Sequence, residues 1–152
     1  MEDCLICNRI EMIKKGTNKY FVKELETGYI VIGDHQYFKG YTLFLCKEHK
    51  NELHELDSDF KEKFLVEMSR VSEAVYKAFK PIKLNYELLG NGDSHMHWHI
   101  FPRSEQEPNP THPVWWTPRD QMYAENVKPN AEELSAMKKL LVSELDKIMT
   151  SY

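Results

Sequence analysis

The chain has few cysteines, no long apolar run and no excess of basic charge. Its three cysteines are odd in number and too few for a disulfide framework, so we expect reduced thiols. No window approaches about 18 consecutive apolar residues, which excludes a membrane-spanning helix. The first residues lack the basic start and apolar stretch of a signal peptide. We therefore expect a cytoplasmic protein with no membrane partner.

Charge and composition narrow the class further. Acidic residues outnumber basic ones by 24 to 20, a formal net charge of −4, whereas nucleic-acid binding needs a basic field. We expect no nucleic-acid partner. Hydrophobic residues make up 41% and charged residues 29%, as in an average globular protein. The length predicts one domain over 1–152, with a core over 4–103 and a Pro- and aromatic-rich segment plus a C-terminal helix over 104–152.

Hydrophobic periodicity predicts an α+β fold: about five strands in an antiparallel sheet with two long helices packed on one face. The first long helix is expected over 57–80, with Asp57 or Ser58 as its cap. The second is expected to begin at Ala131, after a capping box formed by Asn130 and Glu133. A short helix is expected over 5–15. Residues 90–94 predict a tight hairpin, and six prolines between 102 and 129 argue against regular structure there. Strands are expected over 20–23, 29–32, 42–46, 83–89 and 95–101.

Alternating histidines in one strand are the strongest functional signal. His95, His97 and His99 should share one strand face, and the apolar residues between them should face the core. Histidine titrates near neutral pH, so one ring could attack a phosphate while its neighbour stabilises charge. The alternatives are a metal site or a solvated polar face.

The residues 95–101, His-Met-His-Trp-His-Ile-Phe, resemble the signature of the histidine triad (HIT) family. The resemblance extends over about 4–103 and implies the HIT-like fold, a small-molecule nucleotide as ligand, and a homodimer. It implies that His97 is the nucleophile that forms a covalent nucleotidyl-histidine, and that His99 contacts the phosphate. Purine nucleoside phosphoramidates or dinucleoside polyphosphates are the implied substrates, and the chemistry itself requires no divalent ion.

A structural zinc site is also expected. Cys4 and Cys7 have the Cys-x-x-Cys spacing of a zinc knuckle. The resemblance implies that His49 and His95 complete the ligand set. His54 is a competing ligand candidate, because it lies only five residues beyond His49. Two buried apolar cysteines are the alternative reading, and we interpret Cys46 as a core thiol.

Four further residues are candidates for substrate binding. Asn91 stands where the family places an amide donor, but Gly92 stands where the family places a hydroxyl residue. Asn91 and Ser94 could still donate to phosphate, whereas Asp93 would repel it if it pointed inward. Asp34 lies one residue from the family's ribose-binding position, and Arg103 follows the histidine strand. Trp115, Trp116 and Tyr123 either anchor their irregular segment against the domain or a second subunit, which we favour, or they stack on a base or cover the pocket.

Two other functions fit these residues. One is a nucleotide-binding or regulatory module with little catalysis, which the altered loop before His95 favours. The other is a zinc-dependent hydrolase whose metal is bound by the three histidines.

Overall fold

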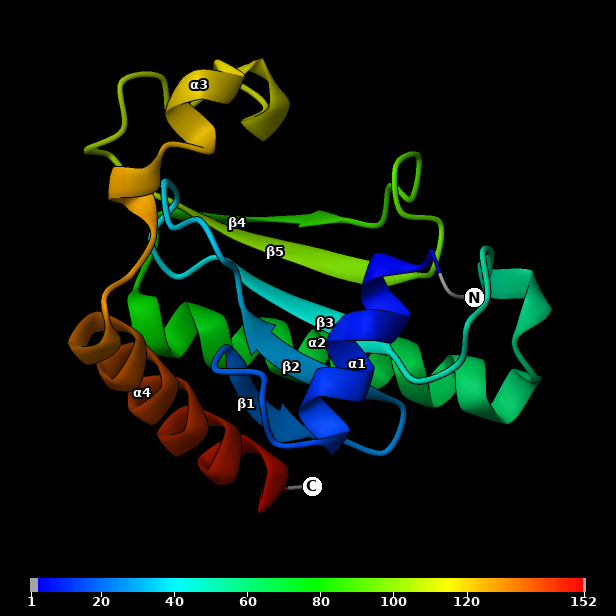
Figure 1. The fold of residues 1–152 in the computed structure, drawn as a ribbon. Helices are drawn as coiled ribbons and strands as arrows, with labels where there is room; N and C mark the ends of the chain where they lie inside the picture. The colour runs from blue at the N-terminus through cyan, green and yellow to red at the C-terminus, as the bar shows by residue number, and fades with distance from the viewer. Residues whose placement is uncertain (1–2, 152) are drawn as a thin grey trace.

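The computed structural model describes residues 3–151 and contains a five-stranded antiparallel sheet in the order β1-β2-β3-β5-β4 (Figure 1). Every pair of neighbouring strands is antiparallel. β5 lies between β3 and the edge strand β4. The predicted α+β class is confirmed. The strands are β1 (Phe21–Glu24), β2 (Gly28–Ile32), β3 (Thr42–Cys46), β4 (Lys83–Glu87) and β5 (His97–Arg103).

Two long helices cover one face of the sheet, as expected. α2 (Ser58–Phe79) packs on β3 and β5, and α4 (Ala131–Met149) packs on β1, β2 and α2. The other helical elements are shorter. They are α1 (Leu5–Lys14), α3 (Arg119–Met122) and the 3₁₀ turns η1 (Leu53–Glu55), η2 (Val114–Trp116) and η3 (Glu125–Val127). Within residues 3–151 we find no helix with the length and apolar character needed to cross a bilayer.

The sequence predicts a local cause for the start of α4 and for both ends of α2, and the structure agrees at two of these three ends. Asn130 accepts from the Glu133 amide while the Glu133 side chain accepts from the Asn130 amide, which is the predicted capping box of α4. α2 ends at Lys80, whose φ of 51° is left-handed, directly before Pro81. The expected side-chain cap of α2 is wrong, because Asp57 holds the cap position without a side-chain hydrogen bond.

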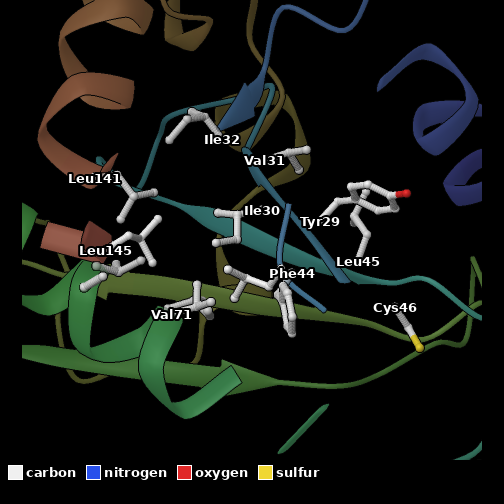
Figure 2. Close-up of a cluster of buried hydrophobic side chains, with 14 of the residues drawn as sticks. Tyr29, Ile30, Val31, Ile32, Phe44, Leu45, Cys46, Val71, Leu141 and Leu145 are labelled. Carbon is white, nitrogen blue, oxygen red and sulfur yellow. The ribbon is translucent and has the colours of Figure 1, made fainter. Parts of the chain in front are cut away.

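The main core lies between the sheet and the two long helices. Figure 2 shows Ile30 of β2 and Phe44 of β3 beside Val71, Leu141 and Leu145 of the helices, all fully buried. Burying each such side chain contributes roughly 1.5–3 kcal/mol relative to leaving it in water. Alternation along β2 and β3 sends Tyr29, Val31 and Leu45 to the opposite face.

A buried carboxylate ties α2 to the turn between β1 and β2. Glu67 is 4% exposed, and its carboxylate accepts hydrogen bonds from the backbone amides of Glu26 and Thr27 and from the Thr27 hydroxyl. These donors satisfy a charge that would otherwise be costly to bury. The turn that orders the first two strands is therefore fixed from the helix layer.

The connection between β4 and β5 differs from the predicted hairpin. The pairing ends at Glu87 with His99, and β5 begins at His97 rather than at His95. The Met96 amide donates to the Lys50 carbonyl, and the His95 ring bonds the Cys46 carbonyl. These bonds hold the chain before His97 against the loop after β3, away from β4. His95 is therefore close to the other triad histidines in sequence but is not part of their strand.

Candidate active site

His97 and His99 lie on the face of β5 away from the long helices. Between them in sequence, Trp98 packs towards Phe64 of α2, so strand alternation turns the two imidazoles to the other face. Their ring centroids are 4.7 Å apart. Both line a cavity of about 300 Å³ whose walls also include Leu5 and other residues of α1, the middle of β2 and β3, and parts of the segment after β5. That volume is at the lower end of the range for small-molecule sites.

The tautomer of His97 is set by the backbone. Its Nδ1 lies 2.7 Å from the carbonyl oxygen of His95, and a carbonyl can only accept, so Nδ1 carries the proton. The Nε2 atom of the neutral ring is then an unprotonated nitrogen with a lone pair. The side chain is 6% exposed and its ring borders the cavity. His97 therefore presents the form of imidazole that can act as a nucleophile.

His99 has the opposite tautomer. Its Nδ1 lies 2.6 Å from the hydroxyl of Tyr41, and burial raises the pKa of that phenol well above its usual value, so the phenol stays protonated. The buried hydroxyl has no other acceptor among the hydrogen bonds of residues 3–151, so it donates to Nδ1 of His99. Burial, with a smaller contribution from His97, lowers the pKa of His99 from 6.5 to about 3. The ring is therefore neutral at physiological pH with its proton on Nε2. His99 is a hydrogen-bond donor beside an imidazole that carries a lone pair.

Aromatic packing fixes the His99 ring. Its plane is nearly parallel to that of Phe101, and the Phe101 ring stacks on Tyr41 with centroids 4.1 Å apart. Trp115 meets His99 edge to face at 5.8 Å. Rings that pack this way have little freedom to rotate, so the hydrogen bond from Tyr41 has a stable geometry.

A separate cluster brings together Cys4, Cys7, His49 and His95, whose ligand atoms all lie within 4.8 Å of one another. The Sγ atoms of Cys4 and Cys7 lie 3.6 and 3.4 Å from Nδ1 of His95, and Nδ1 of His49 lies 3.2 Å from Sγ of Cys7 and 3.1 Å from Nδ1 of His95. A tetrahedral zinc ion with bonds of about 2.0–2.3 Å separates its ligand atoms by roughly 3.3–3.8 Å. These four residues could therefore bind zinc, as expected.

The surroundings of the cluster also fit a cation. The Nε2 atom of His95 lies 2.7 Å from the Cys46 carbonyl and donates to it, which leaves Nδ1 unprotonated towards the cluster. Burial and the neighbouring Cys4 raise the pKa of the Cys7 thiol, an effect that a bound cation opposes. When bound, zinc would connect the start of α1 to the chain before β5.

This ligand set favours a structural zinc site over a hydrolytic metal centre formed by the three histidines. His54 lies in η1 and is not part of the cluster, and neither His97 nor His99 belongs to it. Four protein ligands leave a tetrahedral ion no open position for water, which is typical of structural zinc and not of a hydrolytic centre. Cys46 is fully buried, as expected of a core thiol, and burial raises its pKa to about 11.

The candidate substrate-binding residues lie in different places. Asp34 lines the His97 cavity and forms a 2.8 Å ion pair with Arg9 of α1. Ser94 lines a neighbouring cavity of about 420 Å³ that also reaches His97. Asn91 lies exposed on the loop before β5, outside the residues that line either cavity, whereas Asp93 lines the His97 cavity itself.

The structure does not bring Arg103, the fourth candidate for substrate binding, to the His97 cavity. Its guanidinium is buried at 4% exposure and is held by Glu107 at 2.7 Å and by the Asn85 side chain at 2.8 Å. It lies over the Phe38 ring and does not border the His97 cavity. A buried ion pair with these partners has a structural role, because it connects the end of β5 to the segment that follows.

Sequence reasoning missed two parts of the site. Tyr41 lies directly before the predicted strand 42–46, and no local pattern links it to His99, 58 positions away. The apolar side chains of α1, including Leu5 and Ile6, form a cavity wall that its short helical pattern did not reveal. Trp115 and Tyr123 also line the cavity, which favours the covering role over simple anchoring.

The comparisons with known proteins agree with this geometry. The HIT domain model matches residues 16–106, and the chain therefore belongs to the HIT family, a superfamily of nucleotide-binding hydrolases and transferases. An uncharacterized HIT-like protein from Borreliella burgdorferi is 29% identical over 114 residues, which are 70% of this chain and 80% of that protein.

Two solved structures illustrate the shared fold. A histidine triad protein from Bradyrhizobium japonicum superposes with a TM-score of 0.72 at 22% identity, over 82% of this chain and 89% of that one. A zinc-bound histidine triad family protein from Mycobacterium smegmatis gives a TM-score of 0.67 at 14% identity, over 99% of both chains. At these identities the likeness concerns the fold.

Proposed function

We propose that the protein is a nucleotide hydrolase or nucleotidyl transferase in which Nε2 of His97 attacks the α-phosphorus of a purine nucleoside phosphoramidate or dinucleoside polyphosphate. The bond from phosphorus to the leaving group breaks as the Nε2–phosphorus bond forms, and the leaving group takes the electron pair and a proton from solvent. Water, or another acceptor in a transfer reaction, then attacks phosphorus and loses a proton. The Nε2–phosphorus bond breaks, and the ring regains its lone pair.

The observation that carries this proposal is the hydrogen bond from Nδ1 of His97 to the His95 carbonyl. It leaves the lone pair on the nitrogen that has no protein partner among the hydrogen bonds of residues 3–151. A neutral ring held in this tautomer requires neither a base to activate it nor a metal ion to position it.

The reaction also requires stabilisation of the negative charge that develops on the phosphate oxygens, and His99 can supply it. Its proton lies on Nε2, so the ring can donate to a phosphate oxygen beside His97. A donor held in place before the reaction needs no reorganisation in the transition state, and removing one such donor typically costs about 10²–10³-fold in rate.

The test is the replacement His97→Ala. We expect turnover of adenosine 5′-phosphoramidate and of a diadenosine polyphosphate to disappear, because no other residue carries the covalent step. In the wild type, an alkaline quench with radiolabelled substrate should trap a nucleotide on the peptide that contains His97. The control is His112→Ala, an exposed histidine outside the cavity, which should retain activity. Unchanged turnover in purified His97→Ala protein would refute the proposal.

One observation favours a second function, nucleotide binding with little catalysis. Asp93 lines the same cavity as His97, and its carboxylate would repel a bound phosphate. If this function holds, calorimetry should detect AMP binding while no member of a substrate panel is hydrolysed. Replacement of Asp93 by Asn should then strengthen AMP binding without creating turnover.

A further inference from the structure

The segment after β5 forms one wall of the His97 cavity. Trp115 in η2 and Tyr123 after α3 both line that cavity, and they lie beyond residues 16–106 that the HIT domain model matches. This wall is therefore additional to the part of the chain that defines the family.

Both aromatic rings follow directly after buried anchors. Val114 is fully buried and Met122 is 5% exposed, and the two join Phe38 and Phe101 in a second hydrophobic cluster. The Trp115 indole nitrogen donates to the Glu87 carboxylate of β4. The wall is consequently held against the sheet at several points, and its rings have defined positions.

The rings remain partly open to solvent in spite of this anchoring. Trp115 is 40% exposed and Tyr123 is 42% exposed. Arg119 lies with its guanidinium 4.9 Å from the centre of the Tyr123 ring, and within residues 3–151 it forms no ion pair. An open aromatic surface beside an uncompensated cation matches a ligand that carries both a ring and negative charge.

The chemistry places such a ligand on the leaving-group side. In phosphoryl transfer, the attacking and leaving atoms lie roughly in line through phosphorus. His97 attacks from the surface of the sheet, so the leaving group must depart away from the sheet. Besides the sheet and its loops, the segments that line this cavity are α1 and the wall of Trp115 and Tyr123.

We propose that Trp115, Tyr123 and Arg119 form a leaving-group subsite that selects substrates whose leaving group is itself a nucleotide or another aromatic phosphate. This inference rests on the proposed function of His97 and names its preferred substrate class. The rings stack on the aromatic part, and Arg119 neutralises the phosphate that departs. A small leaving group such as ammonia gains nothing from these contacts.

The experiment compares two substrates that share the same nucleoside. Adenosine 5′-phosphoramidate releases ammonia, whereas diadenosine tetraphosphate releases a nucleotide. In Trp115→Ala, the ratio of kcat/KM for the dinucleotide to that for the phosphoramidate should fall about tenfold, in line with the stacking lost per base. Arg119→Gln should lower the same ratio, and Trp115→Phe should restore part of it. The matched control is Trp116→Ala, because Trp116 is 69% exposed and lies outside the cavity.

The outcomes separate the subsite from the nucleophile. An equal loss for both substrates, or an unchanged ratio in both the Trp115 and the Arg119 variants, overturns the subsite and leaves the role of His97 intact. If the wild type turns over neither substrate, calorimetry on His97→Ala decides the subsite. Diadenosine tetraphosphate should then bind about tenfold more weakly when Trp115 is also replaced, while the affinity for AMP changes less. Equal weakening for both ligands overturns the subsite.

Discussion

Two neighbouring imidazoles on one strand hold opposite tautomers because their Nδ1 atoms meet opposite partners. The His95 carbonyl can only accept, and the buried Tyr41 phenol donates. One ring therefore presents a lone pair and the next presents a proton, which is the pair of properties that attack on a phosphate requires. The two rings differ because Nδ1 of His97 meets an acceptor and Nδ1 of His99 meets a donor.

Replacement of Tyr41 by Phe tests this arrangement. Without the phenol, His99 can populate both tautomers, and we expect kcat to fall about tenfold because a fraction of the molecules lacks the Nε2 proton. The ring nitrogen NMR signals of His99 should show a single Nε2–H tautomer in the wild type and a mixture in the variant. Because its pKa is about 3, the wild-type ring should stay neutral from pH 8 to pH 5.

The control for this variant is Tyr37→Phe, since Tyr37 lies near the same aromatic cluster but does not border the His97 cavity. It should change neither kcat nor the His99 signals. If His99 keeps one tautomer in Tyr41→Phe, the phenol does not set it.

At the scale of single residues, the sequence predicted what alternation can place but not what distant segments add. The shared face of His97 and His99 follows from the two-residue period of a strand. The buried partners of Arg103 come from Glu107, Asn85 and Phe38, and only the folded chain brings the last two beside it. That is why a residue at the end of the histidine strand was expected to meet substrate and instead has a structural role.

Among the elements, α1 connects the metal cluster to the His97 cavity. Its N-cap Cys4 and its first-turn Cys7 belong to the cluster, and Leu5, Ile6 and Arg9 line the cavity. A helix of this length is marginal without external support. A bound zinc ion would therefore stabilise one wall of the His97 cavity as well as the start of α1.

Replacement of Cys7 by Ser should remove bound zinc, because the cluster loses one of its two thiolates. We expect inductively coupled plasma mass spectrometry to find zinc in the wild type and little in the variant. Thermal unfolding of the variant should begin at lower temperature, because binding to the folded state alone stabilises it. Hydrogen exchange in α1 should become faster.

Cys46→Ala is the matched control. Cys46 contributes only its backbone carbonyl to His95, so this variant should lose some core packing and keep its zinc. Equal zinc content in the Cys7→Ser variant and the wild type would contradict the assignment of the cluster.

Strands and helices could be predicted from the sequence where local patterns determine them. They could not be predicted where hydrogen bonds between distant segments determine the backbone path. The strand Thr42–Cys46 agrees with its prediction at both ends, and both long helices agree to within two residues at their starts. Residues 90–94 have the composition of a tight turn, yet bonds from His95 to Cys46 and from Met96 to Lys50 draw the connection away from β4. Turn chemistry cannot reveal such partners, because they come from the loop after β3.

At the scale of the whole molecule, the two long helices pack on β1, β2, β3 and β5, and β4 is the edge strand beyond β5. Tyr86 on β4 is 49% exposed, and Ile82 and Leu89 on either side of the strand are 53% and 52% exposed. An open strand edge with apolar neighbours readily pairs with another strand. We propose that the protein forms a homodimer through β4, in agreement with the expectation from family resemblance.

Light scattering coupled to size-exclusion chromatography tests the dimer. The wild type should elute with twice the mass of the chain, and Tyr86→Lys should shift the protein towards the monomer, because it places a charge at the centre of the edge. Leu140→Lys is the control: Leu140 is equally exposed at 51% but lies on α4, so this variant should stay dimeric. Since Glu87 on β4 accepts from Trp115, pairing at this edge would also steady the leaving-group subsite, and the monomeric variant should show a lower preference for the dinucleotide substrate. A wild type that is monomeric at all concentrations would contradict this interface without affecting the roles of His97 and His99.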